Sequence, residues 1–345
     1  MQHEITVSQP LLDRKGHIQE EGWARQSLWQ YDRTKIHAGK LRIKEWDYYA
    51  VMSHQNRFCI TATISDLGYA AMFALAFIDL NEGKAVQVDA IKAFTLGKTG
   101  LPQDSGDYSV AWANEEFRLA FSRKGDIRRL LVAAPHMVLP HGLTGLDADI
   151  TLIQPPQMES INIATSWADK RTAFYLNEKV NCMPAGGMVR LGDTVIDLGA
   201  TEAFGTLDWG RGNWTYRNRW YWGSASGQIK GVPFGFNIGY GFTDRSPASE
   251  NAIFHNGRIH KLDEVVFHIP ASGYTDPWKF TSSDGRFEMD FQPIVDRSSL
   301  TNALVIKSVQ HQVFGRFSGK AVLDDGTIVA VEDFLGFAED VYNRY

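Results

Sequence analysis

The chain has 345 residues, an apolar fraction of 44% and a formal net charge of −5. Its length favours two domains, and the acidic balance, with no long run of lysine or arginine, argues against nucleic acid or an anionic membrane as a partner. The two cysteines, Cys59 and Cys182, lie far apart and outside any CxxC motif, which argues against a disulfide scaffold and a structural zinc site.

Targeting and cofactor signals are weak throughout the chain. The polar start at residues 1–4 has no apolar segment of the kind that secretion signals carry. The longest apolar run, 69–78, is about half the length needed to span a bilayer. We therefore expect a cytoplasmic protein with reduced thiols and no integral membrane segment. The histidines lack metal-binding spacing and no glycine-rich nucleotide motif is complete, so we expect neither a metal nor a cofactor.

Strand signals dominate the first half of the chain. Apolar runs bounded by glycine, aspartate and asparagine predict strands at 57–65, 69–80, 84–94, 117–122 and 127–134. Residues 69–78 are apolar on both faces of such a strand, so we expect burial on both sides.

The second half repeats this pattern. It predicts strands at 214–226, 232–242, 250–256, 258–269, 286–292, 302–318, 320–324 and 327–334. Asn256-Gly257 and Asp325-Gly326 are typical of tight hairpin turns, which need positive φ. Helical spacing is scarce. The end of the chain, 334–345, is predicted as a short helix with Phe337 and Val341 on one side, and a weaker helix is predicted near 112–118.

Many short strands with regular turns predict an all-β protein built as sandwiches or up-and-down barrels. Prolines concentrate in a loop-rich stretch around 135–160, which is typical of a connector. We place two β domains at 1–170 and 171–345, with the boundary between 140 and 200.

The segment 208–222 carries the strongest functional signal. It contains four tryptophans, two tyrosines, three arginines and one carboxylate. If its second part is a strand, alternation places one set of side chains together on one face: Trp214, Tyr216, Asn218, Trp220 and Trp222. The other face then carries Thr215, Arg217, Arg219 and Tyr221. A stripe of rings suits an extended apolar ligand and any cation that forms on it. The alternative is a tryptophan-rich core strand with its arginines in solvent.

Several segments together resemble a known family. They are Gly22-Trp23-Ala24-Arg25, Glu45-Trp46-Asp47-Tyr48-Tyr49, Asp208-Trp209-Gly210-Arg211-Gly212 running into Trp220-Tyr221-Trp222, and Gly336-Phe337-Ala338-Glu339. On these motifs the sequence resembles the domain-of-unknown-function family DUF2804 over nearly the whole chain.

A more distant similarity bears on chemistry. The motif at 45–49 is similar to the Glu-Trp-Trp-Tyr motif of AttH-like and carotenoid 1,2-hydratase (hydroxyneurosporene synthase) proteins, and plant tocopherol cyclase looks like a relative. This similarity implies two lipocalin-like antiparallel β-barrel or sandwich domains packed together, with few short helices. It also implies a hydrophobic, isoprenoid- or lipid-like ligand. Asp47 stands where those proteins have a second tryptophan, so the similarity does not transfer an activity.

We consider Asp208 the first candidate for a catalytic acid, with Glu45 and Asp47 as alternatives. A carboxyl group in an apolar pocket has a raised pKa, and it can protonate a carbon–carbon double bond or a carbonyl. Water or an internal hydroxyl would then complete a hydration or cyclisation. The predicted ligand-binding residues are the flanking aromatic and basic side chains: Trp46, Tyr48, Tyr49, Trp209, Arg211, Trp214, Tyr216, Arg217, Arg219, Trp220 and Trp222.

Each candidate acid also has a structural interpretation. Asp208 precedes a glycine-containing stretch and suits a turn or a helix cap. Arg211 could also keep Asp208 ionised, in which case the acid is another residue. Glu45 and Asp47 suit a buried ion pair that links the two halves, with Arg211, Arg217 or Arg219 as the partner.

Three functions therefore stay open at this level. The first is a cofactor-independent hydratase, isomerase or cyclase that acts on a hydrophobic molecule. The second is a non-catalytic lipid carrier or sensor. The third is a carbohydrate-binding β-protein, which would need an open groove lined by exposed rings, because tryptophan also stacks on sugars. The oligomeric state and the identity of the ligand do not follow from the sequence.

Overall fold

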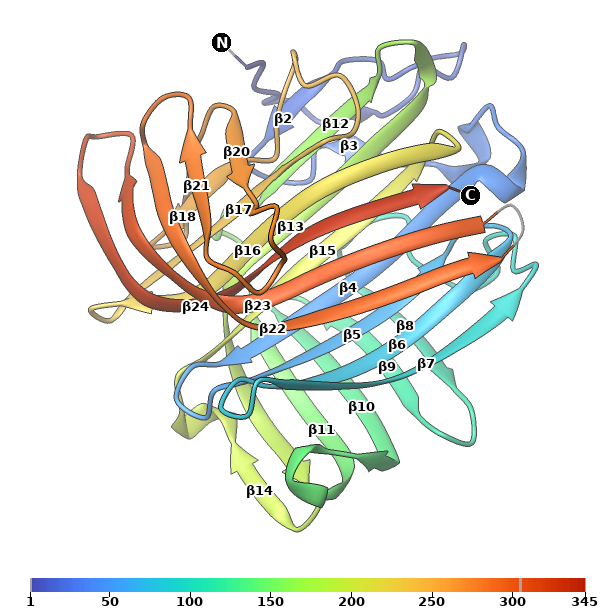
Figure 1. The fold of residues 1–345 in the computed structure, drawn as a ribbon. Helices are drawn as coiled ribbons and strands as arrows, with labels where there is room; N and C mark the ends of the chain where they lie inside the picture. Colours follow the sequence, from blue (N-terminus) through green and yellow to red (C-terminus); the bar gives the residue numbers. More distant parts are fainter. Residues whose placement is uncertain (1, 304–305, 345) are drawn as a thin grey trace.

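The computed structural model describes residues 2–303 and 306–344, and these residues form almost entirely antiparallel β-structure (Figure 1). They build two curled sheets of 13 and nine strands, together with a small parallel sheet that pairs β1 (Gln9–Pro10) with β3 (Trp29–Gln30). The predicted all-β class is confirmed, and each large sheet curls into a half-barrel.

The first large sheet has the order β7-β6-β5-β4-β15-β13-β11-β10-β9-β8, with β12 and β14 paired to β13 and β2 paired to β12. Its strands are β2 (Gly22–Ala24), β4 (Ile43–Ser53), β5 (Phe58–Asp66), β6 (Ala70–Asp79), β7 (Lys84–Ala93), β8 (Tyr108–Ala113), β9 (Arg118–Lys124), β10 (Ile127–Val138), β11 (Thr144–Ile153), β12 (Ile161–Trp167), β13 (Lys170–Leu191), β14 (Thr194–Asp197) and β15 (Ala203–Asn213). Short 3-10 turns lie in its connections: η1 (Arg33–Lys35), η2 (Lys40–Arg42), η3 (Pro140–Gly142) and η4 (Leu198–Ala200).

The second large sheet has the order β19-β18-β17-β16-β24-β23-β22-β21-β20. Its strands are β16 (Arg217–Ile229), β17 (Val232–Tyr240), β18 (Ala252–His255), β19 (Arg258–Lys261), β20 (Val265–His268), β21 (Trp278–Ser282), β22 (Phe287–Ala303), β23 (Ile306–Val322) and β24 (Ile328–Arg344). The chain changes sheets between Asn213 and Arg217. The predicted domains, 1–170 and 171–345, are units that would fold separately, and their limits stay a prediction.

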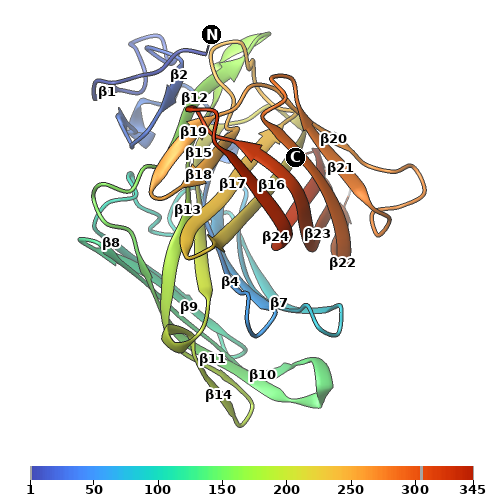
Figure 2. The ribbon, with the colours of Figure 1, turned by 90° about the vertical axis from the view of Figure 1, so that its left-hand side faces the viewer.

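The two sheets pack across one another at one end of the first sheet (Figures 1 and 2). Strands β9, β10, β11 and β14 extend away from the second sheet, whereas the long strands β22 to β24 lie against β4 to β6. Apolar side chains from both sheets fill the contact, including Ala76 and Ile78 of β6 and Phe314 and Phe337 of the second sheet. We call this contact the seam.

Strand β6 shows how the pattern of the sequence produces this arrangement. Alternate residues point to opposite faces of a strand. Phe73, Leu75 and Phe77 therefore face the core of the first half-barrel, and Ala76 and Ile78 face the seam. The prediction of burial on both sides of 69–78 is confirmed for β6, because from Phe73 onward all its residues are buried.

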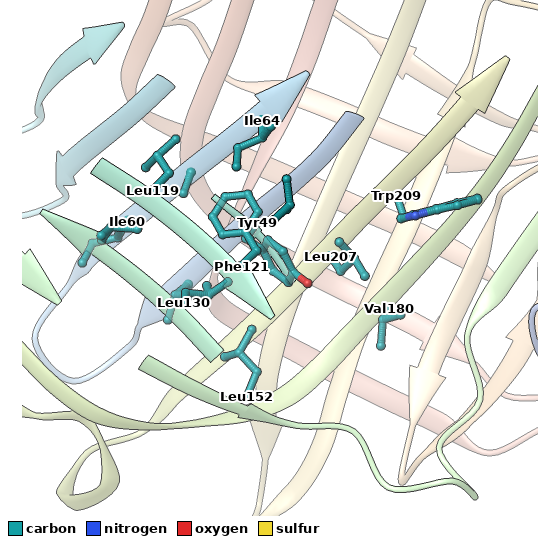
Figure 3. Close-up of a cluster of buried hydrophobic side chains, with 14 of the residues drawn as sticks. Tyr49, Ile60, Ile64, Leu119, Phe121, Leu130, Leu152, Val180, Leu207 and Trp209 are labelled. Carbon is teal, nitrogen blue, oxygen red and sulfur yellow. The ribbon is translucent and has the colours of Figure 1, made fainter. Parts of the chain in front are cut away.

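The core of the first half-barrel is a single large cluster, part of which Figure 3 shows. Tyr49 lies inside it and packs edge-on against Phe121, with ring centroids 5.1 Å apart. Leu207 and Trp209 of β15 belong to the same cluster. The second half-barrel has its own phenylalanine-rich core, which includes Phe236, Phe267 and Phe317. Each curled sheet therefore encloses a core on its concave side, separate from the seam.

Non-local pairing places β15 between β4 and β13. Tyr48 lies beside Asp208 in the ladder, and Asp47 lies beside Trp209. On the other side Lys179 of β13 lies beside Asp208. The two motifs that carry the family resemblance are therefore neighbours in space.

Two predicted helices are wrong. Residues 334–344 belong to β24, and 112–118 form the end of β8, a turn and the first residue of β9. Phe337 and Val341 would lie on one face of a helix. Two residues four apart also lie on one face of a strand, because four is a multiple of the two-residue strand period. Pairing of β24 with both β16 and β23 decides for the strand.

The predicted hairpin turns are confirmed. Asn256 and Gly257 have φ of 48° and 76° and join β18 to β19, and Gly326, with φ of 85°, lies between β23 and β24. Cys59 and Cys182 are free and buried. Among the described residues no helix is long and apolar enough to cross a membrane.

Candidate functional site

The predicted site residues on β4 and β15 are divided between the two faces of the first sheet. Because neighbouring side chains on a strand point in opposite directions, the predicted residues do not form one cluster. Five of them lie on the concave side of the first half-barrel: Glu45, Asp47, Tyr49, Trp209 and Arg211. Three others lie on the seam side: Trp46, Tyr48 and Asp208.

The concave side carries a buried ion pair. Arg211 Nη2 donates to Asp47 Oδ1 at 2.9 Å, and both side chains are fully buried. Arg211 also donates to the carbonyl of Pro102 through Nε and Nη2, and its guanidinium lies 4.1 Å from the centroid of the Trp209 ring. The bridge that the sequence suggested for Asp47 therefore exists, but it joins adjacent strands of one sheet rather than the two halves.

Glu45 has different partners from those expected. It accepts a hydrogen bond of 2.7 Å from the hydroxyl of Tyr31 and forms an ion pair with Arg33. Both partners precede β4 in the chain, so this pair ties the segment around η1 to the sheet. Arg211 lies opposite Glu45 in the β4–β15 ladder, but its guanidinium bonds Asp47 and the carbonyl of Pro102 instead.

Asp208 lies within β15, which excludes the turn and helix-cap interpretations. Lys179 Nζ lies 2.8 Å from Asp208 Oδ2, and Asn177 Nδ2 donates to Oδ1 at 2.7 Å. The lysine and the amide therefore bond both oxygens of the carboxyl group and fix its position. From the sequence we considered Arg211 as the cation beside Asp208, whereas in the structure Lys179 is the cation that contacts it.

Lys179 is the centre of a larger acidic cluster. Its Nζ also lies 3.8 Å from Glu250 Oε2 and 3.9 Å from the centroid of the Trp222 ring. Glu250 lies just before β18 and is buried. Burial raises the pKa of Glu250, Lys179 opposes this increase, and Asp208 adds to it. One lysine therefore faces more than one carboxyl group.

Glu339 of β24 is the third carboxyl group of this cluster. It lies beside Trp222 and Gln312 in the ladders of the second sheet. Gln312 Nε2 donates to Glu339 and also lies 3.0 Å from the hydroxyl of Tyr48, and Trp220 Nε1 donates to Glu339 at 3.3 Å. Burial raises the pKa of Glu339 to about 7. This carboxyl group therefore holds a proton for much of the time near neutral pH.

Aromatic rings surround the acidic cluster. Trp46 stacks on Tyr175 with ring centroids 5.7 Å apart, and Trp214 packs edge-on against both Trp46 and Trp220 at 5.6 Å. Trp214 is buried, whereas Trp46 and Trp220 are half-buried. Because the rings pack on one another, they do not form the open row of exposed faces that a sugar-binding groove needs.

The remaining predicted residues lie on or just before β16. Trp220 and Trp222 face the seam, and Arg219 faces the opposite, concave side of the second sheet, so the predicted alternation is confirmed within this strand. Tyr216 and Arg217 are exposed where β16 begins. The structure therefore places these two away from the acidic cluster.

Comparison with known families agrees with the motifs at 45–49 and 208–222. A family model described as "Domain of unknown function (DUF2804)" matches residues 2–345. The chain belongs to this family. A comparison with curated proteins finds no significant match for this DUF2804 chain.

Several solved structures are similar to the DUF2804 chain at low sequence identity. CghA in complex with Sch210972 is 11% identical, with 88% of each chain covered and a TM-score of 0.51. Kievitone hydratase from Nectria haematococca is 13% identical, with 88% of each chain covered and a TM-score of 0.46. A putative AttH from Nitrosomonas europaea is 12% identical over 87% of this chain and 92% of the other, with a TM-score of 0.45.

Sequence reasoning did not single out three residues of this candidate site: Lys179, Glu250 and Glu339. Glu339 belongs to the motif at 336–339 that supports the family resemblance. The helix predicted at 334–345 gave no reason to place Glu339 near Trp222. Lys179 and Glu250 carry no local signal, because only the pairing of β13 with β15 and the docking of the second sheet bring them together. Within the described part of the chain, no group of three or more histidine, cysteine, aspartate or glutamate side chains is arranged to hold a metal ion.

Proposed function

We propose that this protein binds a hydrophobic, isoprenoid- or lipid-like molecule at the seam and acts on it as a cofactor-independent acid catalyst. Hydration, isomerisation and cyclisation of a carbon–carbon double bond are the reactions that suit the site. The observation that carries this proposal is Glu339: a buried carboxyl group with a pKa of about 7, bounded by the tryptophans of β16. A general acid works best when its pKa lies near the working pH.

The proposed hydration uses two carboxyl groups. Glu339 transfers its proton to one carbon of the double bond, whose electron pair forms the new C–H bond, and a carbocation remains at the other carbon. Water adds to that carbon, and a carboxylate takes the proton that water releases. Asp208 suits this second role because it lies in the same cluster and Lys179 and Asn177 hold its two oxygens in place. In isomerisation or cyclisation, loss of a proton or attack by an internal group replaces the addition of water.

The aromatic rings support the cationic step. The face of an aromatic ring attracts positive charge, and Lys179 already occupies such a position over Trp222. Trp46 and Trp220 are half-buried and therefore present ring surface that a ligand can reach. Exclusion of bulk water would strengthen each of these electrostatic contacts. A structure with this fold holds Sch210972, which supports the ability of the fold to bind an organic compound.

The first test is mass spectrometry of the gently purified full-length protein, in the native state and after organic extraction. We expect a co-purified isoprenoid or acyl lipid that is released by the solvent. If one is found, it supplies the series of compounds for the assay. Recovery of only a water-soluble sugar would contradict the proposed ligand class.

The second test separates catalysis from carriage. The protein is incubated in D₂O with farnesol and with any extracted alkene, and the product is examined for a new C–D bond. Asp208→Asn should reduce turnover strongly and leave ligand binding nearly unchanged. Binding without deuterium incorporation in the wild-type protein would favour the lipid carrier or sensor instead.

A further inference from the structure

A pocket lies on the concave side of the second half-barrel, on the other face of β16 and β24 from the seam. It has a volume of about 400 Å³, within the range of small-molecule sites. Its floor includes Tyr221 and Phe267, and the segment 269–274 between β20 and β21 forms one wall. The proposed function makes no use of this pocket.

Strand alternation separates the pocket from the proposed catalytic site. Arg219 and Tyr221 of β16 and Asp340 of β24 line the pocket. Trp220 and Glu339, each a direct neighbour of these residues in sequence, face the seam on the other side of the same sheet. A molecule in the pocket therefore contacts different side chains from a molecule at the seam.

The polar groups of the pocket form a fixed unit. Arg219 donates through Nε and Nη2 to the two oxygens of Asp340, at 2.8 and 2.5 Å, and the Tyr274 hydroxyl donates to Asp340 Oδ2 at 2.8 Å. The Tyr274 ring stacks on His311, with centroids 3.8 Å apart and an interplanar angle of 12°. His311 in turn contacts Asp296 at 2.7 Å. These contacts hold the wall segment against the sheet.

The chemistry of this unit restricts the ligand. Arg219 and Asp340 cancel each other in charge, so the pair gives no net preference for an anion or a cation. They place N–H donors beside a carboxylate acceptor, which together suit a hydroxyl group. Tyr221 is half-buried and presents part of its ring to the pocket, Phe267 is buried against it, and Ile269 and Ala271 add apolar surface at the wall. Offset or edge-on packing of a planar ring on such residues is favourable.

We propose that this pocket binds a neutral, planar ring compound that bears a hydroxyl group. The hydroxyl lies at the Arg219–Asp340 pair, where it accepts from the guanidinium and donates to the carboxylate. The ring lies against the exposed part of Tyr221 and the apolar side chains of the wall segment.

Calorimetric titration of the full-length protein with 2-naphthol tests the proposal. We expect saturable binding. Ala271→Trp should weaken it by at least about tenfold, because the new ring fills the pocket at an exposed wall position. Ser272→Trp is the matched control, because Ser272 is also exposed but does not line the pocket. The affinity of this variant for 2-naphthol should stay within about twofold of the wild-type affinity.

A second probe tests the hydroxyl group. 2-Methoxynaphthalene keeps the rings but cannot donate a hydrogen bond, and it should bind about tenfold more weakly, the size of one lost hydrogen bond. No saturable binding of 2-naphthol, equal affinity for the two probes, or the same loss of affinity in both tryptophan variants would each overturn the proposal.

Discussion

The two faces of β4 and β15 carry two buried charged clusters that differ in their balance of charge. On the concave side of the first half-barrel, one carboxylate, Asp47, faces one guanidinium, Arg211, and both are fully buried. On the seam side, Lys179 faces Asp208 and Glu250, with Glu339 close by. The first cluster is neutral as a pair, whereas the second has more carboxyl groups than cations.

This difference separates a structural cluster from a chemical one. A matched buried pair has no reason to exchange protons, and its main effect is to fix neighbouring strands. Surplus carboxyl groups in an apolar site retain protons instead, because burial disfavours their charged forms. Strongly perturbed carboxyl groups of this kind are typical of functional sites. The seam is therefore the better candidate, and this favours Asp208, the first candidate from the sequence, over the alternatives Glu45 and Asp47.

The largest expected effect concerns catalysis. Glu339→Gln keeps the shape of the side chain but removes the transferable proton, so turnover of the alkene should fall by about 10²–10⁴-fold. The matched control is Glu332→Gln, an exposed glutamate on the same strand, which should retain wild-type turnover. The measurement is product formation in D₂O. Unchanged turnover in the Glu339 variant would exclude it as the proton donor.

The next effect concerns the concave cluster. Arg211→Met leaves Asp47 buried without its cation, and the free energy of unfolding should decrease by about 3–5 kcal/mol. The double variant Asp47→Asn/Arg211→Met removes both charges and should recover much of this loss. Urea unfolding of the three proteins measures both changes. If the single and double variants are equally unstable, the ion pair is not the cause.

A third effect is the dependence of stability on pH. The pKa of Glu339 rises from 4.5 to about 7 on folding. Between these two pH values the folded protein keeps a proton that the unfolded chain has lost. The contribution of Glu339 to the free energy of unfolding is therefore fully present below pH 4.5 and is lost as the pH rises to about 7. The change amounts to about 3 kcal/mol. Glu339→Gln should abolish this part of the dependence.

The difference between wild type and the Glu339→Gln variant isolates this group, because the other titrating groups are common to both proteins. Unfolding free energies at pH 5 and pH 8 are sufficient for the comparison. A difference that stays constant between the two pH values would mean that Glu339 is charged in the folded protein. Turnover should also decrease as the pH rises through about 7, because the protonated form is the donor.

The smallest effect concerns the contact between Gly210 and Trp46 on the seam side. A Cβ atom at Gly210 would lie 2.1 Å from Cζ2 of Trp46, so Gly210→Ala must move the indole ring. We expect a loss of about 1–3 kcal/mol in stability and weaker binding of the extracted ligand. Gly39→Ala is the control, because a Cβ there meets no atom within 4 Å. Equal stability of both variants would contradict this packing.

Much of the fold was predictable because it depends on local patterns. Turn residues between apolar runs predicted most strands, and Asn256-Gly257 predicted a hairpin that positive φ confirms. Alternation predicted that Trp220 and Trp222 share a face opposite Arg219. The prediction failed at 334–344, where a spacing of four residues fits a helix and a strand equally well. Pairing with strands distant in sequence decided between them.

The sequence by itself determined the all-β class and the family, and it made Asp208 the first candidate acid. Only the tertiary structure decided which acids share a site. Strand periodicity separates Asp47 from Asp208 onto opposite faces, but it does not say which distant residues meet them. Lys179, Glu250 and Glu339 come from separate strands and a loop. They meet at Asp208 because β15 inserts between β4 and β13 and the second sheet then covers that face.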